Sequence, residues 1–240
     1  KIRCCSFNFF NKETNFKSSY KKDYFQFNLK NGIIIKSYYD MCIDFKIPIK
    51  GYFKKHTPKQ GDVVIDCGAY GGAFSLYVAK LIGEKGKVIA FEPDVENYKL
   101  LSKNIELNGL QNIISLNKGA WSKNTFLPFD NKHAGDSSFF NNDQKESLVN
   151  TEVVTIDSEL DKIGIKNIDF IKMDVEGAEI EALKGAEKIL RSSNANLAIA
   201  SYHILNGEKT CSEVEKLLSG FGYKTETSFP AHLTTYAAKT

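Results

Sequence analysis

The sequence predicts an α/β fold built around a mostly parallel β-sheet, and three observations carry this prediction. From residue 61 onward, short runs rich in valine and isoleucine alternate with segments of helical periodicity. A glycine-rich turn, residues 68–72, separates the first of these runs from the first helix. Two further runs close the chain with a short Phe-Pro link between them, as in an antiparallel pair. Alternating strands and helices form a parallel sheet with right-handed crossovers and with helices on both faces.

Seven runs are expected to form the main sheet, because most of them are short, apolar and bounded by turn residues. They are residues 63–66, 87–91, 113–116, 168–173, 197–200, 223–228 and 233–238. Helices are expected at 73–82, from Asp94 to near Gly109, through 183–190 and at 211–219. Asp94 can cap the second helix, and Gly109 can end it. Residues 121–150 are polar and predicted to be irregular, and residues 152–156 alternate like an additional strand.

An N-terminal extension, residues 1–60, is expected to precede the main domain, residues 61–240. Residues 1–20 are polar enough for a loose arm, whereas Asn31-Gly32 joins two strand-like runs in a β-hairpin, since both positions tolerate positive φ. The extension holds thirteen lysines and arginines against four acidic residues, a balance of +9, and thirteen of the 29 aromatic residues. Such a segment can attract an anionic substrate, nucleic acid or a membrane surface, or it can be a solvated face over an aromatic core.

Composition narrows the class of protein. A hydrophobic fraction of 42% and a charged fraction of 25% are ordinary for a globular domain with a packed core. No apolar run approaches the roughly 18 residues of a membrane span, and the first residues lack the apolar core of a secretory signal. The five cysteines are odd in number and lack C-x-x-C spacing, which predicts a reducing compartment, the cytoplasm, rather than disulfides or a zinc site.

The turn after the first strand of the main domain predicts a cofactor that contains a nucleoside. In an open α/β sheet, ligands bind beyond the carboxyl ends of the strands where strand order reverses. A dinucleotide fingerprint, G-x-G-x-x-G, fails because Tyr70 stands at its second glycine. The remaining spacing, D-x-G-x-x-x-G at Asp66, Gly68 and Gly72, resembles the first motif of class I methyltransferases, which bind S-adenosyl-L-methionine (SAM). The backbone of the turn, with Ala69 and Tyr70, is expected near the methionine part and the ribose, and Asp66 near the ammonium group.

Further positions strengthen the cofactor prediction. Glu92, followed by Pro93, ends the second strand twenty residues beyond the last glycine of the turn, where a carboxylate can accept hydrogen bonds from both ribose hydroxyls. The ribose of NAD would satisfy the same carboxylate, so Glu92 indicates a nucleoside rather than SAM specifically. After the third strand, Asn117, Gly119 and Ala120 lie where methyltransferases contact adenine.

A longer likeness points to a family. The stretches DCGAYGGAFS, FEPDVENYKLLSKNIELN, the GDSS loop and IDFIKMDVEGAEIEALKGAEKIL resemble the FkbM-type methyltransferase family. The likeness runs from about residue 61 to residue 203, and D-V-E-G-A-E is its most specific piece. The resemblance implies the class I, Rossmann-like fold with a seven-stranded sheet. It also implies transfer of a methyl group from SAM, usually to a hydroxyl oxygen of a sugar, a lipid-linked glycan or a natural product.

The expected catalytic residues lie at the carboxyl ends of two later strands. Asp174 ends the fourth core strand, Glu176 follows it, and His203 follows the fifth. Methyl transfer from a sulfonium to an oxygen is an in-line displacement, and a carboxylate or histidine near the oxygen can act as general base. The order of preference for the base is Asp174, His203 and then Glu176. No metal site is expected, because Asp174 and Glu176 lack an evident third carboxylate partner.

Other polar residues carry weaker indications. His133 is more typical of an exposed loop than of a lid over the substrate. Ser137 and Ser138 match the serine-rich loop of the family without an assigned role. His56 and His232 lack supporting context.

Two departures from the family pattern keep alternatives open. Tyr70 replaces the usual asparagine of G-A-N-x-G, and Ala200-Ser201-Tyr202 stand where an acidic residue is common. The leading hypothesis is an O-methyltransferase for a small-molecule or glycan acceptor. The basic extension suggests an RNA ribose methyltransferase instead, in which aromatic residues hold unpaired bases. The third hypothesis is a methyltransferase-like binding protein that has lost the cofactor, against which the intact glycine-rich turn and Glu92 argue.

Overall fold

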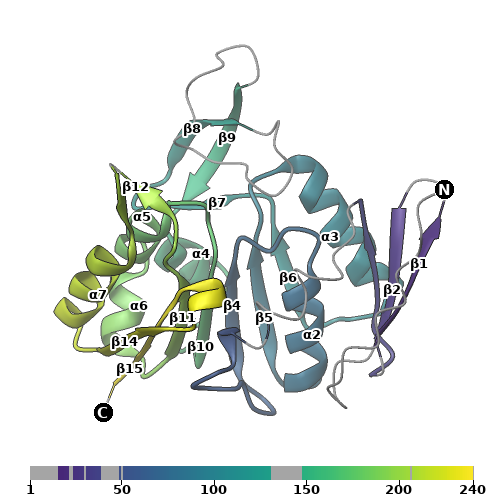
Figure 1. Cartoon of the computed structure of the whole chain (residues 1–240), viewed down its shortest axis with the longest axis horizontal. Coiled ribbons are helices and arrows are strands. Elements are labelled where there is room, and N and C mark those ends of the chain that lie inside the picture. Colours follow the sequence, from purple (N-terminus) through teal and green to yellow (C-terminus); the bar gives the residue numbers. More distant parts are fainter. Residues whose placement is uncertain are drawn as a thin grey trace.

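The structure is a computed structural model of the chain, and it describes residues 16–21, 24–29, 31–38, 49, 51–130, 148–205 and 207–239. Its centre is a seven-stranded sheet with helices on both faces (Figure 1). The strand order is β14 (Lys224–Ser228), β15 (Thr234–Ala238), β11 (Asn196–Ala200), β10 (Phe170–Met173), β4 (Val63–Cys67), β5 (Lys87–Phe91) and β6 (Ile113–Leu116). All seven strands lie where the sequence predicts them, to within two residues at either end.

The strand directions define the end of this sheet at which a ligand is expected. Strands β4, β5, β6, β10 and β11 run parallel, whereas β15 runs antiparallel to both β11 and β14. Strand β4 comes first in the parallel set and lies between β5 and β10, so the order of strands reverses beside it. The carboxyl ends of β4 and β10 therefore flank the expected ligand-binding point.

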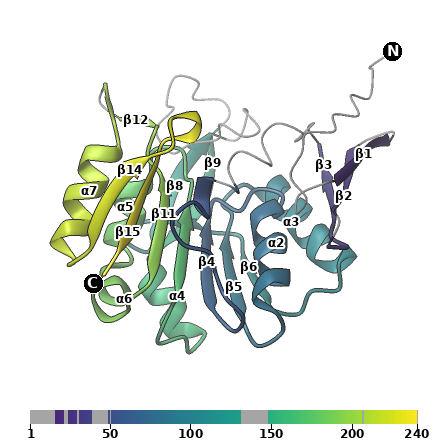
Figure 2. The ribbon, with the colours of Figure 1, turned by 60° about the horizontal axis from the view of Figure 1, so that its bottom comes forward.

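Two hydrophobic clusters hold the helices against the sheet. The helices α2 (Ala73–Ile82) and α3 (Val95–Leu107) cover one face, and α4 (Ile156–Lys162), α5 (Glu179–Lys184), α6 (Glu187–Ser192) and α7 (Cys211–Gly220) cover the other (Figure 2). Strand β4 serves both faces, because Val64 packs in one cluster and Ile65 in the other. Within the described ranges, no helix has the length and apolar character needed to cross a membrane.

Capping residues set the bounds of α3 as predicted. The Asp94 carboxylate accepts hydrogen bonds from the backbone N–H groups of Glu96 and Asn97, at 2.9 and 2.8 Å. These bonds satisfy donors that the first helical turn leaves unpaired. At the other end, Gly109 has a φ of 60°, the left-handed conformation that lets the chain turn away from the helix.

The single helix predicted through 183–190 is instead two helices, α5 and α6, with Gly185 between them. A Cβ atom on Gly185 would lie 1.9 Å from the backbone oxygen of Trp121. Glycine is therefore required where the backbone of Trp121 crosses, and glycine is a poor residue for a helix interior. The prediction of one continuous helix is wrong for this reason.

Within the region predicted to be irregular, residues 121–150, the described residues 125–130 and 148–150 form strands, which corrects the prediction there. A second sheet contains three strands, in the order β7 (Gly119–Ala120), β9 (Leu148–Val154) and β8 (Thr125–Asp130). Strand β9 pairs parallel with β7 and antiparallel with β8. A short hairpin of β12 (Ile204–Leu205) and β13 (Glu208–Lys209) is a further addition to the predicted elements.

The strand predicted at 152–156 ends at Val154, because a helix begins directly after it. Thr155 caps α4 by accepting a hydrogen bond at 3.1 Å from the backbone N–H of Ser158. A threonine at this position favours the start of a helix over the continuation of a strand. Helix α4 is therefore an addition to the elements predicted from the sequence.

The predicted N-terminal hairpin is present within a small antiparallel sheet of β1 (Phe16–Lys21), β2 (Tyr24–Leu29) and β3 (Ile34–Ser37). Gly32 in its turn has a φ of 85°, as expected from Asn31-Gly32. Strand β1 overlaps the predicted loose arm, so that prediction is wrong for residues 16–20. Residues 1–15 lie outside the described residues.

Two asparagines attach this small sheet to α3. The side chain of Asn104 accepts a hydrogen bond from the Lys36 N–H and donates one to the Lys36 carbonyl, at 2.9 and 2.8 Å. Asn108 makes the same two bonds with Ile34, at 2.8 and 2.7 Å. Four residues of helix advance about 6 Å, close to the roughly 6.6 Å of two strand residues, so both amides match β3.

The N-terminal extension also contributes to the core of the main domain. Tyr52 is 2% exposed, and the Tyr236 hydroxyl donates to the Gly51 carbonyl at 2.6 Å. One hydrophobic cluster contains Ile35 of the extension together with Val64 of β4. The two parts therefore share a core, and the boundary at residue 60 stays a prediction.

Candidate active site

The glycine-rich turn closes the carboxyl end of β4 against its two neighbours. The backbone N–H groups of Gly68 and Ala69 both donate to the Phe91 carbonyl at the end of β5, each at 3.0 Å. On the other side, a Cβ atom on Gly68 would lie 1.8 Å from the backbone oxygen of Asp174, and Gly68 has a φ of 78°. Glycine alone fits both the positive φ and the lack of space for a Cβ atom. The residue predicted to leave room for a cofactor is therefore required by the protein's own backbone.

Gly72 is restricted in the same way. It has a φ of 88°, and a Cβ atom there would lie 2.5 Å from Leu101 Cδ1 and 2.7 Å from Leu76 Cδ1. Its backbone N–H donates to the Ala69 carbonyl at 2.8 Å, which completes the turn before α2 begins. The predicted turn is present, and its contact with a cofactor stays a prediction.

Asp66 is fully buried beneath the turn and paired with a lysine. Its carboxylate accepts hydrogen bonds from Lys172 Nζ at 2.9 Å and from the Ser75 hydroxyl at 2.5 Å. Lys172 also donates to the Gly68 carbonyl at 2.7 Å. Burial alone would lower the pKa of Lys172, but the charges of Asp66 and Asp174 outweigh it and raise the pKa. Asp66 thus supports the turn from below, and its role near an ammonium group stays a prediction.

Glu92 directly follows β5, where it was predicted to end the strand, and its carboxylate lies against the turn. It accepts hydrogen bonds from the backbone N–H groups of Tyr70 and Asp94, at 2.6 and 3.1 Å, and from Asn97 Nδ2 at 3.4 Å. Burial raises the pKa of Glu92 to about 7, although these hydrogen bonds limit the rise. A ligand with two hydroxyl groups that donate hydrogen bonds to this carboxylate would favour the ionised form of Glu92.

The remaining cofactor-binding candidates lie around the end of β5. Tyr70 has a φ of 50°, an uncommon value for a residue other than glycine. The Asn117 side-chain amide donates to the carbonyls of Glu92 and Pro93, at 2.9 and 3.2 Å. Strand β7, Gly119–Ala120, is buried and paired with β9. Contacts of these residues with an adenine ring stay predictions.

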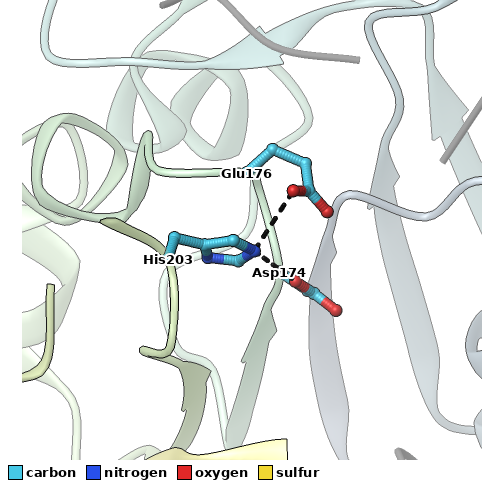
Figure 3. A group of neighbouring side chains, drawn as sticks. All are labelled: Asp174, Glu176 and His203. Carbon is cyan, nitrogen blue, oxygen red and sulfur yellow. Dashed lines mark ion pairs between the residues drawn. The ribbon is translucent and has the colours of Figure 1, made fainter. Parts of the chain in front are cut away.

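The three predicted catalytic residues converge beyond the carboxyl ends of β10 and β11 (Figure 3). His203 Nε2 lies 3.5 Å from Asp174 Oδ1 and 3.3 Å from Glu176 Oε2. The side chains of Asp174 and Glu176 keep 21% and 28% of their surface exposed, whereas that of His203 keeps 8%. Glu176 has a φ of 52°, and such backbone strain often marks a functional site.

Carboxylates on both sides of its ring determine the charge of His203. Its Nδ1 lies 2.9 Å from Oε1 of the fully buried Glu179. Glu179 also accepts hydrogen bonds from the backbone N–H groups of Val175 and Gly177, at 3.3 and 3.2 Å. Burial alone would lower the pKa of His203, but the carboxylates of Glu176 and Glu179 raise it to about 10. In this arrangement the imidazole is protonated at neutral pH.

Asp174 receives polar groups that the sequence did not predict. The Tyr52 hydroxyl donates to Oδ2 at 2.7 Å, and the Tyr202 hydroxyl donates to Oδ1 at 3.4 Å. His232 Nε2 lies 3.6 Å from Oδ2. Burial would raise the pKa of Asp174, but the neighbouring His232 and the charge of Lys172 hold it well below its usual range. Asp174 is therefore a persistent carboxylate and a weak proton acceptor, which lowers its rank as general base.

Some of the side chains that complete the site could have been recognised in the sequence, and others could not. Lys172 is a charged residue in the otherwise apolar run FIKM, and Glu179 is the last acid of D-V-E-G-A-E, so both could have been singled out. Tyr52 comes from the N-terminal extension, and His232 from a short 3-10 helix between β14 and β15. Their positions depend on the packing of distant segments, and nothing in their neighbourhood indicated them.

Two further predictions concern the polar residues of one loop and the absence of a metal site. His133, Ser137 and Ser138 lie outside the described residues. The expectation of no metal site rested on a missing third carboxylate, whereas the structure supplies an imidazole. One donor atom from each of Asp174, Glu176 and His203 lies within 4.8 Å of the other two.

Comparison with known proteins gives a consistent match. Residues 66–225, which are more than half of the chain, match the family model described as the methyltransferase FkbM domain. The methyltransferase sdnD of Sordaria araneosa is 31% identical over 159 residues, which cover 52% of this chain and 60% of that protein. The chain thus spans about three fifths of the length of this curated relative.

Solved structures share the fold. An FkbM methyltransferase of Methylobacillus flagellatus superimposes with a TM-score of 0.58 at 22% identity, covering 77% of this chain and 45% of that one, so this chain spans less than half of that protein. A fibrillarin of Aeropyrum pernix, crystallised with natively bound SAM, gives a TM-score of 0.52 at 11% identity and covers 94% of this chain and 99% of its own. At these identities the likeness shows the fold alone, which is the one the sequence predicts.

Proposed function

Because the chain belongs to the FkbM methyltransferase domain family, we propose that it methylates a hydroxyl oxygen of a sugar, a glycan or another small molecule. The methyl donor is SAM, as the glycine-rich turn predicts: the family is one of methyltransferases, and the Aeropyrum pernix fibrillarin holds SAM on the same fold. One observation carries the proposal for the acceptor end. Asp174, Glu176 and His203 converge directly beside the turn, whose Gly68 touches the backbone of Asp174.

We assign SAM, the methyl donor, to the side of the site formed by the glycine-rich turn and the end of β5. The ribose hydroxyls donate to Glu92, and the adenine lies near Asn117 and β7. Each charge-assisted hydrogen bond of this kind is typically worth about 1.5–3 kcal/mol. Support for this placement comes from the Glu92 carboxylate, which lies 2.6 Å from the backbone nitrogen of Tyr70 and thus faces the turn.

The acceptor oxygen must lie in line with the bond between the methyl carbon and sulfur. As the oxygen–carbon bond forms, the carbon–sulfur bond breaks, its electron pair stays on sulfur, and the hydroxyl proton leaves late. The persistent charge of Asp174 makes it a strong hydrogen-bond acceptor, so we assign it the orientation of the hydroxyl. We assign the departing proton to the Glu176 carboxylate, which lies 3.3 Å from Nε2 of the protonated His203.

Calorimetric titration of the chain with SAM, and in parallel with NAD, tests the donor end. We expect micromolar binding of SAM and no heat from NAD. Glu92→Ala should abolish SAM binding while thermal unfolding stays cooperative, and an unchanged affinity would exclude the ribose contact. Hydroxylated glycans can then be screened as acceptors with isotopically labelled SAM, with the methylated product detected by mass spectrometry.

RNA is the second acceptor class, and the charge of residues 1–60 is the observation that favours it. A balance of +9 in sixty residues would draw a polyanion. Binding to single-stranded RNA should then weaken steeply between low and physiological salt, because counterions are released on binding. Methylation of a neutral glycan should be nearly independent of salt, so a salt series with both acceptors separates the two classes.

A folded chain that binds no SAM would favour the third hypothesis, a binding protein that has lost the cofactor. Tyr70→Asn would then be the first reversion to test, since it restores the usual residue of the turn. The cytoplasmic location stays a prediction from the cysteines, of which Cys67 and Cys211 are free thiols in the described part of the chain.

A further inference from the structure

Asp174, Glu176 and His203 have the spacing of a metal-ligand set. Two ligand atoms, each about 2.1 Å from one ion, are about 3.0–3.5 Å apart when the angle between them is near that of octahedral or tetrahedral coordination. His203 Nε2 lies 3.5 Å from Asp174 Oδ1 and 3.3 Å from Glu176 Oε2. A small adjustment of the two carboxylates would bring all three atoms onto one ion.

His203 supplies a second, independent observation. Its side chain is only 8% exposed, and among the described residues neither of its ring nitrogens has a hydrogen-bond partner of normal geometry. Nε2 nevertheless points between the two carboxylates (Figure 3). Buried polar nitrogens are rarely left in this condition. An ion between the three residues, in place of the Nε2 proton, would give Nε2 a partner, while Nδ1 faces Glu179.

Glu179 positions His203 as a ligand. In metalloproteins, the second nitrogen of a ligating histidine commonly faces a carboxylate, which leaves the lone pair of the first nitrogen for the ion. Here Nδ1 lies 2.9 Å from Glu179 Oε1, and Glu179 is fully buried. Hydrogen bonds from the backbone N–H groups of Val175 and Gly177 hold that carboxylate in place.

The charge of the cluster also favours a cation. Asp174, Glu176 and Glu179 bring three carboxylates to one imidazole. Lys172 is committed to Asp66 and to the backbone of the turn. Without a further cation, the negative charge in this partly buried cluster exceeds the positive charge.

We propose that Asp174, Glu176 and His203 form a binding site for a divalent first-row transition metal ion such as Mn²⁺. One imidazole with two carboxylates suits such an ion better than Ca²⁺ or Mg²⁺, which prefer oxygen ligands alone. The exposed fractions of Asp174 and Glu176, 21% and 28%, leave one side of the ion open to further ligands.

The catalytic use of the ion, unlike its binding, rests on the proposed function. An acceptor hydroxyl bound to the open side would have a lowered pKa and would release its proton to solvent water. The oxygen then bonds to the methyl carbon, the carbon–sulfur bond breaks, and its electron pair stays on sulfur. The products are a methyl ether and S-adenosylhomocysteine, and the ion is neither oxidised nor reduced.

Titration of the chelator-treated full chain with Mn²⁺, followed by electron paramagnetic resonance, tests the site without reference to activity. We expect one Mn²⁺ per chain with a micromolar Kd, and spin-echo modulation from one imidazole nitrogen in the unmutated chain. His203→Gln should weaken Mn²⁺ binding at least tenfold, and Glu179→Gln about tenfold. His56→Gln removes a histidine outside the cluster and should leave the affinity unchanged.

Absence of stoichiometric Mn²⁺, or of nitrogen modulation, would overturn the site, as would equal losses of affinity in His203→Gln and His56→Gln. If His203→Gln fails to fold, as judged by thermal unfolding, the nitrogen modulation of the unmutated chain decides. Titration of the same preparation with SAM separates the two proposals. SAM binding without Mn²⁺ binding refutes the metal site, whereas Mn²⁺ binding without SAM binding supports the site and refutes the methyltransferase function.

Discussion

The proposed donor and acceptor sides of the site are built in opposite ways. The glycine-rich turn is held by its own backbone, by Phe91 on the neighbouring strand and by the buried Asp66–Lys172 pair. The acceptor side gathers polar and charged groups from distant segments, such as Tyr52 and Asp174, which are 122 residues apart. It leaves His203 without regular hydrogen bonds. The chain's own hydrogen bonds thus hold the glycine-rich turn in place, whereas the cluster of Asp174, Glu176 and His203 carries an excess of negative charge that the proposed ion would offset.

The largest expected effect separates chemistry from donor binding. Asp174→Asn keeps the size of the side chain and removes its charge, so turnover should fall about 10²–10⁴-fold. SAM affinity should stay within a few-fold, because the turn contacts the backbone of Asp174 rather than its carboxylate. Initial rates and calorimetry measure the two quantities, and equal losses in both would remove the distinction between the two sides.

The second largest expected effect concerns the buried ion pair of Asp66 and Lys172, which lies beneath the glycine-rich turn. Lys172→Met leaves the fully buried Asp66 without its counter-charge, which should lower the free energy of unfolding by about 3–5 kcal/mol. Lys188→Met breaks an exposed ion pair between Lys188 and Asp161, whose side chains are 68% and 62% exposed, and should leave the free energy of unfolding nearly unchanged. Urea denaturation compares the two variants, and similar losses would show that the buried pair is dispensable.

A comparison of Gly68 with Gly109 tests how closely the glycine-rich turn packs against the end of β10. Gly68 and Gly109 both have positive φ, but a Cβ atom on Gly109 meets nothing within 4 Å, whereas one on Gly68 would strike the Asp174 backbone oxygen. Gly109→Ala should therefore cost about 1 kcal/mol from backbone strain, and Gly68→Ala about 2–5 kcal/mol. Equal losses in chemical denaturation would mean that the end of β10 can move away from the turn.

The smallest expected effect concerns the pH dependence of stability. The pKa of Glu92 is about 7 in the folded chain, above its ordinary value of 4.5. Between these values the folded state binds more protons than the unfolded state, so the free energy of unfolding falls as pH rises, by about 1–3 kcal/mol in all. The loss is complete above about pH 7. Unfolding of the unmutated chain and of Glu92→Gln at pH 5 and pH 8 measures the change, and a constant difference between them would contradict a buried, protonated Glu92.

Residues whose partners are close in sequence were the ones that could be predicted. The strand–turn–helix around Gly68, the cap at Asp94 and the hairpin at Gly32 each depend on a few consecutive residues, and the structure confirms these local features. The break between α5 and α6 could not be predicted, because it depends on the passage of Trp121 against Gly185. The same holds for His232, which reaches Asp174 only after the last two strands have paired.

The acceptor residues Asp174, Glu176 and His203 occupy an intermediate position. Their place at the ends of adjacent strands follows from the parallel topology, so their convergence could be expected. The charge state of His203 could not, because it depends on Glu179, which reaches the ring from the start of α5. Knowledge of the fold therefore located the cluster but did not give its chemistry.

Asn104 and Asn108 of α3 affect whether β3 can pair with a strand of another molecule. Strand β3 lies at the edge of its sheet, and an open edge can recruit a strand from another molecule. The amides of Asn104 and Asn108 already bond the N–H and carbonyl groups of Ile34 and Lys36. The helix thereby takes the place of a fourth strand. A foreign strand could add at this edge only by breaking four hydrogen bonds, which protects the β3 edge of the sheet from edge-to-edge aggregation.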